Sequence, residues 1–122
     1  MNIDYQKVLS EYILGVDVVK FAYLFGSYAN GTNTDKSDID IAVYLKDTSL
    51  DSRLQLVYEL SKLTKKDVDL VVLNTVKNIY LLDNILTNYK ILKDSEERVD
   101  FELKAEHDIL DYKAFRGFMD AA

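Results

Sequence analysis

Apolar positions recur at a spacing near 3.6 residues in several segments, which predicts helices there. The first segment covers residues 4–14, and Gly15 stands where that helix would end. A second segment, residues 50–63, has charged side chains opposite its apolar face, which indicates an amphipathic helix. The apolar face of the first segment consists of Tyr5, Val8, Leu9, Tyr12 and Ile13.

Short apolar runs rich in aromatic and β-branched residues predict strands between the helical segments. The runs are KFAYLF at residues 20–25, IDIAVYL at 39–45 and DVDLVVL at 67–73. YKIL at residues 89–92 is typical of a short edge strand, and a further helix is expected over residues 75–88.

The C-terminal segment, residues 95–120, carries a helical stripe of apolar positions that is interrupted at Glu106. The predicted elements therefore mix helices with strands along the whole chain, and this order predicts an α/β domain with a small mixed sheet flanked by helices. The stripe runs through Val99, Leu103, Leu110, Ala114 and Phe118.

Length and composition place the chain among ordinary globular proteins. With 122 residues, 48 % hydrophobic and 30 % charged, it is expected to form one domain over residues 1–122. The net charge of −6 disfavours long nucleic acids as partners, because their binding draws on Lys and Arg. Cysteine is absent, and neither a signal-like N-terminus nor a long apolar run occurs, so we expect a cytoplasmic protein without a membrane span.

Glycine is rare in this chain, and two of the four glycines fall between residues 26 and 31. This segment directly follows the first predicted strand and is the most obvious break in regular structure. Gly26 and Ser27 can offer backbone N–H groups and a hydroxyl to a phosphate, especially if a helical turn begins there.

Two acids stand at the entrance of the second predicted strand. Asp38 and Asp40 are two residues apart, so they are expected on one face with Cα atoms about 6.6 Å apart, while Ile39, Ile41 and Val43 fill the opposite face. Two charges at that distance repel by roughly 2.5 kcal/mol at an effective dielectric constant of 20, and a divalent cation would turn this into attraction. Oxygen donors without cysteine favour Mg²⁺ or Mn²⁺ over zinc.

A third acid would complete a site for two metal ions, the arrangement that serves phosphoryl and nucleotidyl transfer. Asp69 lies inside the apolar strand VDLVVL and is the preferred candidate. Asp67 is the alternative, although it stands beside Lys65 and Lys66 at the start of the strand, where an acid can be solvated.

Gly26-Ser27, ten intervening residues, Asp38-x-Asp40 and the later Asp69 together resemble the signature of the DNA polymerase beta-like nucleotidyltransferase superfamily over residues 20–73. The small size and the stretches GSYANG, SDIDIAV and VDLVVLN are most similar to the minimal nucleotidyltransferases, the MNT antitoxins of HEPN-domain toxins. The run RVDFELKAEHDILDYKAF is also similar to the tail of those antitoxins.

This resemblance implies a nucleotidyltransferase fold and a role for each matching residue. Gly26 and Ser27 would hold ATP, Asp38 and Asp40 would bind two Mg²⁺ ions, and Asp69 would bind the catalytic metal and help to activate the acceptor hydroxyl. The MNT antitoxins are understood to transfer AMP to a tyrosine of their HEPN ribonuclease partner and so to silence it. Many relatives carry Arg where this chain has Asn30.

Nearly every residue up to position 92 is needed for the sheet and its helices, so the acceptor is expected to come from a partner. Segment 95–120 either docks this partner or covers its own sheet. Two other functions stay open: an antitoxin that neutralises by binding alone, and nucleotide transfer to a small molecule such as an aminoglycoside. The aromatic residues of the possible docking segment are Phe101, Tyr112, Phe115 and Phe118.

Three further residues have an ordinary and a functional interpretation. His107, the only histidine, lies among charges and is expected to be a solvated helix residue. Tyr28 follows the Gly-Ser turn and either stacks on a base or packs in the core. Lys36 beside the acids either contacts phosphate or is a plain loop lysine.

Overall fold

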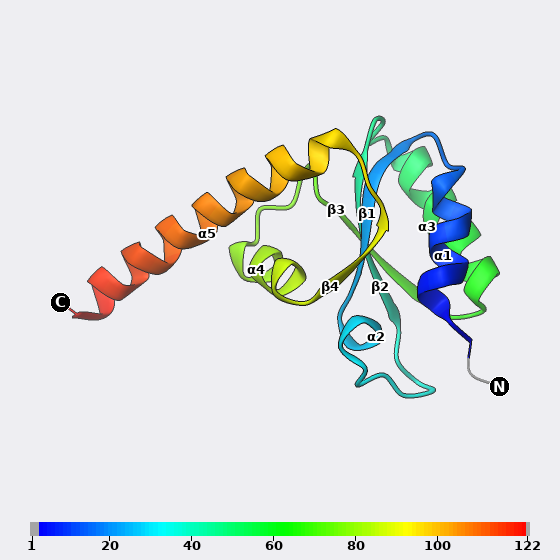
Figure 1. The fold of residues 1–122 in the computed structure, drawn as a ribbon, viewed down its shortest axis with the longest axis horizontal. Helices are drawn as coiled ribbons and strands as arrows, with labels where there is room; N and C mark the ends of the chain where they lie inside the picture. The colour runs from blue at the N-terminus through cyan, green and yellow to red at the C-terminus, as the bar shows by residue number, and fades with distance from the viewer. Residues whose placement is uncertain (1–2, 122) are drawn as a thin grey trace.

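The computed structural model describes residues 3–121 and contains alternating helices and strands (Figure 1). The helices are α1 (Tyr5–Leu14), α2 (Ser27–Asn30), α3 (Leu50–Thr64), α4 (Ile79–Thr87) and α5 (Glu96–Ala121). The strands are β1 (Val19–Phe25), β2 (Ile39–Leu45), β3 (Val68–Val72) and β4 (Tyr89–Lys93).

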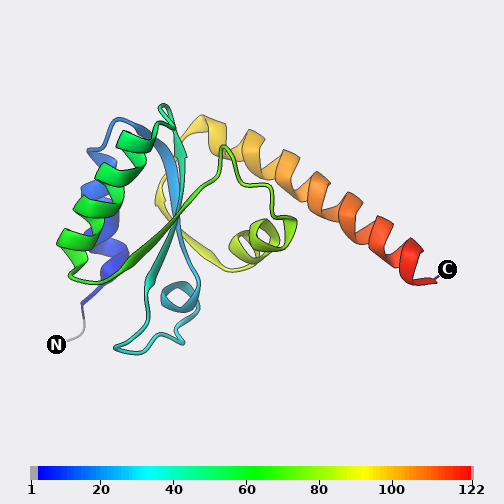
Figure 2. The same ribbon diagram turned by 180° about the vertical axis from the view of Figure 1, so that it is seen from behind.

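The strands form one mixed sheet with the order β3-β2-β1-β4. β1 pairs antiparallel with both β2 and β4, whereas β2 pairs parallel with β3. Helices α1 and α3 lie against one face of the sheet, and α4 and α5 lie on the other side, as the opposite views show (Figures 1 and 2). The predicted α/β class and mixed sheet are therefore confirmed, with β4 at an edge.

Side chains at the helix starts explain where the helices begin. Asp4 accepts a hydrogen bond from the Lys7 N–H at 3.2 Å, and Ser49 accepts one from the Ser52 N–H at 3.3 Å. The helix expected over residues 75–88 begins only at Ile79, because the Asn78 side chain accepts from the amides of Tyr80 and Leu81 and so caps the helix there.

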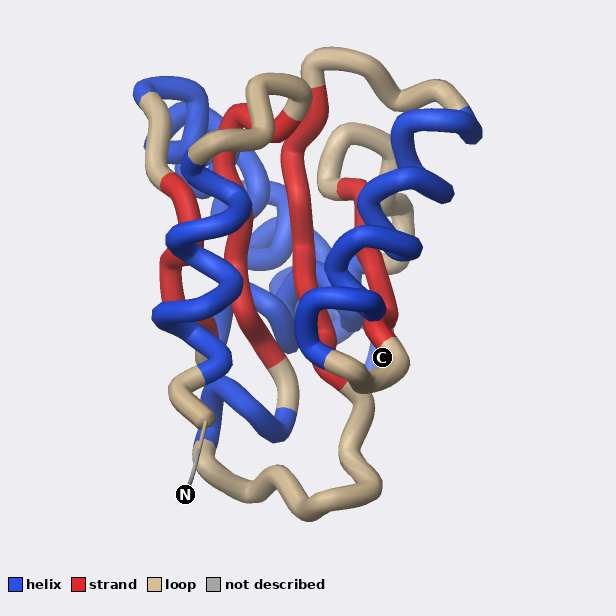
Figure 3. The backbone as a smooth tube through the Cα atoms, turned by 90° about the vertical axis from the view of Figure 1, so that its right-hand side faces the viewer, coloured by secondary structure: helices blue, strands red, loops and turns tan. Residues whose placement is uncertain are grey.

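The sheet separates two hydrophobic cores. One core lies under α1 and α3 and includes Ile39, Ile41 and Val43 of β2, as the alternation along this strand predicted. The other core lies under α4 and α5 and includes Ala42 of the same strand. Figure 3 shows α1 and α3 in front of the strands that divide the two cores.

Helix α5 covers the sheet with a different set of residues from the stripe seen in the sequence. Phe101, Ala105 and Ile109 pack into the second core, whereas Val99, Leu103, Leu110 and Phe118 are exposed. The helix runs without a break through Glu106 and projects beyond the sheet (Figure 1). The apolar stripe is thus an outward face of α5.

Within residues 3–121, no helix combines the length and the apolar composition that crossing a membrane requires.

Candidate active site

Strand β1 ends in a turn that brings a backbone segment against an acid of the next strand. Gly26 has a φ of 70°, a conformation that residues with a Cβ rarely adopt. A Cβ at this position would lie 2.2 Å from Asp40 Oδ2, so the carboxylate occupies the space that any other side chain would fill. The two halves of the sequence signature, Gly26-Ser27 and Asp38-x-Asp40, therefore meet in space.

Helix α2 begins immediately after Gly26 at one end of the sheet (Figure 1). Its hydrogen bonds start with Ala29 and Asn30, whose amides donate to the Gly26 carbonyl at 3.0 and 3.2 Å. The amides of Ser27 and Tyr28 precede this first bonded turn, and amides at such positions are available to bind anions. The buried Ala29 anchors this short helix to the sheet.

Asp40 and Asp69 are direct neighbours on adjacent strands. In the parallel pairing of β2 with β3, Asp40 stands opposite Asp69. Side chains at matching positions of neighbouring strands point to the same face, which is here the face of Ala42 and of the second core. Asp40 is half-buried and Asp69 is exposed, so the pair lies where the core meets solvent.

The electrostatic state of Asp40 reflects this crowding. Burial raises the pKa of the Asp40 carboxyl above its ordinary value, and the negative charges of Asp69 and Asp38 raise it further. A hydrogen bond with Asp69 adds to the effect. The ionised carboxylates repel one another in this arrangement, and a cation placed among them would stabilise their charged form.

Asp38 and Asp67 each stand just before their strand, β2 and β3, and both are exposed to solvent. Asp38 immediately precedes β2 and is exposed, yet its charge acts on Asp40. The Asp67 carbonyl accepts the Ile39 N–H at 3.0 Å, and the Asp67 side chain is exposed. Asp38 and Asp67 both line a cleft of about 420 Å³ that also includes Lys65 and Lys66. The structure thus brings Asp69, rather than Asp67, into register with Asp40.

The residues at this site suit a hard divalent cation. Their donors are carboxylate oxygens, which Mg²⁺ prefers, and the missing Cβ of Gly26 leaves the Asp40 carboxylate directly against the turn that follows β1. Across residues 3–121, no three His, Cys, Asp or Glu side chains are already gathered closely enough to hold an ion. Asp40 and Asp69 therefore share a face of the sheet, and the charge of Asp38 acts on Asp40, but these acids do not form a closed cage.

The loop after α2 is organised by its own side chains. Asn30 accepts hydrogen bonds from the Thr32 amide at 3.1 Å and from the Thr32 hydroxyl at 2.5 Å. The Asn30 side chain is therefore engaged within the loop. Lys36 is exposed, and its amide donates to the Thr34 hydroxyl at 3.3 Å.

Lys66 is a cation near the loop that the sequence did not single out. Its Nζ donates to the Asp35 carbonyl at 3.0 Å and lies 6.0 Å from the centre of the Tyr28 ring. Tyr28 also makes an edge-to-face contact with Tyr5 at 5.3 Å and packs against the first core, which favours its structural interpretation. Only the pairing of distant segments reveals these contacts, so the local sequence carries no signal for them.

His107 is exposed on α5 and lies 3.2 Å from Asp111, one turn further along the helix. The prediction of a solvated helix residue is therefore confirmed.

Comparisons with known proteins agree with this geometry. The family model "Polymerase beta, Nucleotidyltransferase" matches residues 7–98. The chain is 39% identical over 97 residues to protein adenylyltransferase MntA of Shewanella oneidensis, covering 78% of this chain and 67% of the relative. It is also 39% identical over 70 residues to a putative protein adenylyltransferase of Methanocaldococcus jannaschii, covering 55% of this chain and 70% of that protein.

Solved structures of toxin–antitoxin complexes contain a similar chain. One, a toxin–antitoxin with AMP-PNP, matches at a TM-score of 0.72 and 32% identity over 98% of this chain and 94% of that chain. Another, the tri-AMPylated Shewanella oneidensis HEPN toxin in complex with MNT antitoxin, matches at a TM-score of 0.70 and 27% identity, covering 95% and 96%. With the family model spanning most of the sequence, the chain belongs to the polymerase beta-like nucleotidyltransferase family.

Proposed function

We propose that this chain is the antitoxin of a HEPN/MNT pair and transfers AMP from ATP to a tyrosine of its HEPN ribonuclease partner. The observation that carries the proposal is the contact between the Gly26 turn and Asp40, with Asp69 in register beside it. The identity of 39% to a protein adenylyltransferase supports the protein acceptor, and the matched complex with AMP-PNP supports ATP as the donor.

In this reaction the phenolic oxygen of the acceptor tyrosine forms a bond to the α-phosphorus of ATP. The bond from that phosphorus to the bridging oxygen of the β-phosphate breaks, and pyrophosphate leaves. The amides of Ser27 and Tyr28 and the Ser27 hydroxyl bind the phosphates at the start of α2. Asp69, exposed beside Asp40, takes the phenolic proton.

Asp38, Asp40 and Asp69 would hold two Mg²⁺ ions, because the charges of Asp38 and Asp69 both act on the Asp40 carboxylate and disfavour its ionised form in the absence of cations. When bound, the ions neutralise phosphate charge and polarise the phosphoryl oxygens. The Asp40 carboxylate lies against Gly26, so its position relative to the turn after β1 is fixed.

The test measures transfer of labelled AMP from ATP, with Mg²⁺ present, to the purified HEPN protein encoded beside this chain. The parent protein is expected to label a tyrosine of the HEPN protein. Asp40→Ala and Asp38→Ala are expected to lower the rate at least about 100-fold, since each removes a metal-binding carboxylate. Full activity in either variant would refute the metal assignment.

Asp67→Ala is the matched control for Asp69→Ala, because the two acids are two residues apart near the start of the same strand. We expect Asp67→Ala to retain activity and Asp69→Ala to lose it, and the opposite result would move the third ligand to Asp67. Neutralisation of the toxin by Asp38→Ala and Asp40→Ala without any transfer would instead identify an antitoxin that acts by binding alone. Labelling of an aminoglycoside but not of the HEPN protein would identify a small-molecule transferase.

A further inference from the structure

Helix α5 has two apolar faces, and only one of them packs against the protein. Phe101, Ala105 and Ile109 form the inner face in the second core. Val99, Leu103, Leu110, Ala114 and Phe118, called here the outer stripe, form the other face. Leu103, Leu110 and Phe118 are 62%, 66% and 72% exposed. A surface helix usually carries one apolar stripe, so a second one indicates a second surface to be covered.

Helical geometry places these faces roughly opposite each other. At 3.6 residues per turn, the outer stripe stays within about 100° around the helix axis, and its mean direction lies about 165° from that of the inner face. From Val99 to Phe118 the stripe extends about 28 Å. The outer stripe therefore cannot reach the sheet while the inner face is packed.

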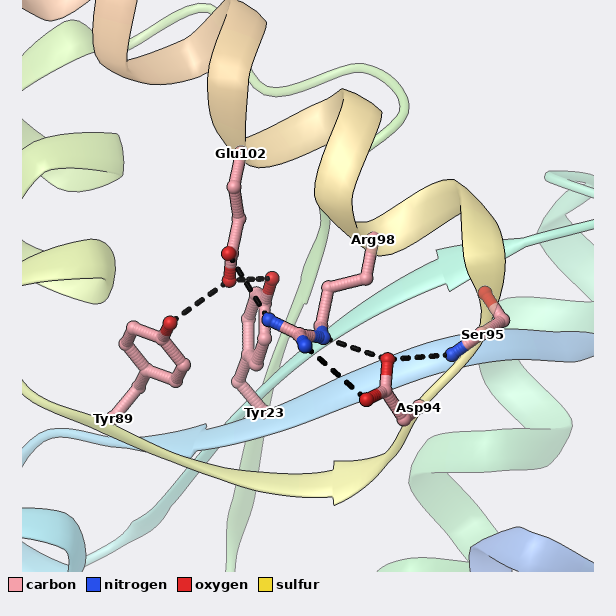
Figure 4. Close-up of polar contacts among 6 residues, drawn as sticks. All are labelled: Tyr23, Tyr89, Asp94, Ser95, Arg98 and Glu102. Carbon is pink, nitrogen blue, oxygen red and sulfur yellow. Dashed lines mark hydrogen bonds and ion pairs between the residues drawn. The ribbon is translucent and has the colours of Figure 1, made fainter.

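Contacts from the side of the inner face hold α5 in this orientation. Near its start, Glu102 accepts hydrogen bonds from the hydroxyls of Tyr23 and Tyr89 at 2.6 and 2.9 Å and from Arg98 at 3.0 Å (Figure 4). Arg98 also binds Asp94, just before the helix. These bonds tie the helix to β1 and β4, so the outer stripe is presented by a fixed helix.

Further along, α5 is fastened to α4. The hydroxyl groups of Tyr80 and Tyr112 form a hydrogen bond, and Arg116 donates to the Tyr80 hydroxyl at 2.9 Å. Lys113 lies 3.2 Å from Asp83. Support from α4 therefore continues to the last turns, at the part of the helix that projects from the domain (Figures 1 and 2).

The charge around the outer stripe indicates what covers it. Helix α5 carries eight acidic and four basic residues, a net charge of −4 within a chain of net charge −6. On or beside the stripe lie four acidic residues, Glu96, Asp100, Glu106 and Asp111, and two basic ones, Lys104 and Lys113, so its border is acidic on balance. A ribonuclease binds a polyanion and needs a basic surface to do so, which is complementary to this acidic border. A second copy of this chain would place like charges together.

The similarity to the complexes supports the same occupant. The chains matched in toxin–antitoxin structures are similar to this one over 95–98% of its length, a span that must include most of α5. Chains of this shape, terminal helix included, thus occur in complexes with a toxin. This agrees with a helix whose outer face is built for a partner rather than for the sheet.

We propose that the outer stripe of α5 is a docking surface for the HEPN ribonuclease that the proposed function requires. The apolar stripe would fit into a groove on that partner, and basic residues at the rim of the groove would face the acidic border of the stripe. This inference rests on the proposed function for the identity of the partner. Docking raises the effective concentration of the acceptor tyrosine at the Asp40–Asp69 site, and it needs no contact with the acids themselves.

The test compares two pairs of exposed leucines. Leu103→Ser with Leu110→Ser removes the middle of the outer stripe, and Leu50→Ser with Leu54→Ser is the control on α3, beyond the other face of the sheet. The four leucines have similar exposure, 62%, 66%, 62% and 57%. Calorimetric titration with the HEPN protein is expected to show at least about tenfold weaker binding for the stripe variant alone. Circular dichroism melting checks that both variants fold.

Activity separates this proposal from the proposed function. The stripe variant should lose AMP transfer to the HEPN protein through a higher KM while binding of ATP is unchanged. Loss of binding in the stripe variant would support docking even if the parent protein transferred no AMP, which would end the proposed reaction alone. Equal binding by parent, control and stripe variants would overturn the docking proposal, as would a self-association of the chain that the stripe variant abolishes.

Discussion

The contact between Gly26 and Asp40 links the fold and the chemistry at a single pair of residues. The turn needs a positive φ, and the carboxylate fills the position where a Cβ would stand. The family resemblance implied that these residues serve one site, and the structure shows why they meet: a turn after β1 and acids at the start of β2 lie at the same end of an antiparallel pair. The sequence could not predict that glycine is required by the acid itself.

Gly26→Ala is expected to lower the free energy of unfolding by about 2–4 kcal/mol, combining a steric clash with the cost of a positive φ. Asp40→Ala should relieve most of the clash, since the Asp40 Cβ lies 3.3 Å from the built Cβ and the near atom is Oδ2. Urea unfolding of both single variants and of the double variant measures this coupling. Additive losses would contradict the contact.

The contacts of Lys66 and Asn30 could not be predicted from the sequence pattern. Lys66 reaches Asp35 and Tyr28 from the end of α3, more than 30 positions along the chain. No local spacing encodes such a pairing, because it depends on how β2 and β3 align. Only the structure shows that the Asn30 side chain is engaged with Thr32.

At the scale of elements, periodicity predicts faces but not what each face contacts. The spacing through Val99, Leu103 and Leu110 correctly marks an apolar face of α5, but the helix packs through Phe101, Ala105 and Ile109 instead. The inner set contains fewer residues and spans fewer helical turns, so it gives a weaker pattern. The start of α4 was missed for a related reason, since one Asn78 cap outweighs the apolar spacing around it.

The attachment of α5 to the sheet predicts a loss of stability at alkaline pH. Burial and the hydrogen bond to Glu102 raise the pKa of Tyr23 well above its ordinary value of 10.0. The folded state therefore keeps a proton that the unfolded state loses above about pH 10, so this stability is complete below pH 10 and falls as pH rises. The loss should be about 1.4 kcal/mol per pH unit for this one group.

Tyr23→Phe tests this attachment. The variant is expected to be less stable at pH 8, because Glu102 loses one donor, and to lose less further stability between pH 10 and 11 than the parent protein. Urea unfolding at both pH values gives the comparison, and Tyr58→Phe serves as a control, because Tyr58 is 66% exposed on α3, on the other side of the sheet from α5. Identical slopes for parent and Tyr23→Phe would remove Tyr23 from this role.

At the scale of the whole molecule, the sheet divides the protein into two sides. Helices α1 and α3 close one side, and α4 and α5 lie on the other (Figures 1 and 2). Asp40 points to the side of α5, because it shares a strand face with Ala42 of the second core. A partner that binds α5 thus approaches from the side on which Asp40 and Asp69 face solvent. Under the proposed function, the sheet and its helices bind ATP, and the acceptor is supplied by the molecule that docks on the outer stripe of α5.

This division predicts how salt affects the reaction. The acidic border of α5 should attract a basic partner over a distance that dissolved ions screen, so raising the salt concentration from about 50 to about 300 mM should slow association with the HEPN protein at least about fivefold. Dissociation should change less, because the apolar seam does not depend on ions. Stopped-flow measurements use the Asp40→Ala variant, which is expected to transfer no AMP, so that docking is measured separately from transfer.

An association rate that does not respond to salt would mean that charge on α5 does not select the partner. The outer stripe would then have to recognise the toxin by shape and apolar contact alone.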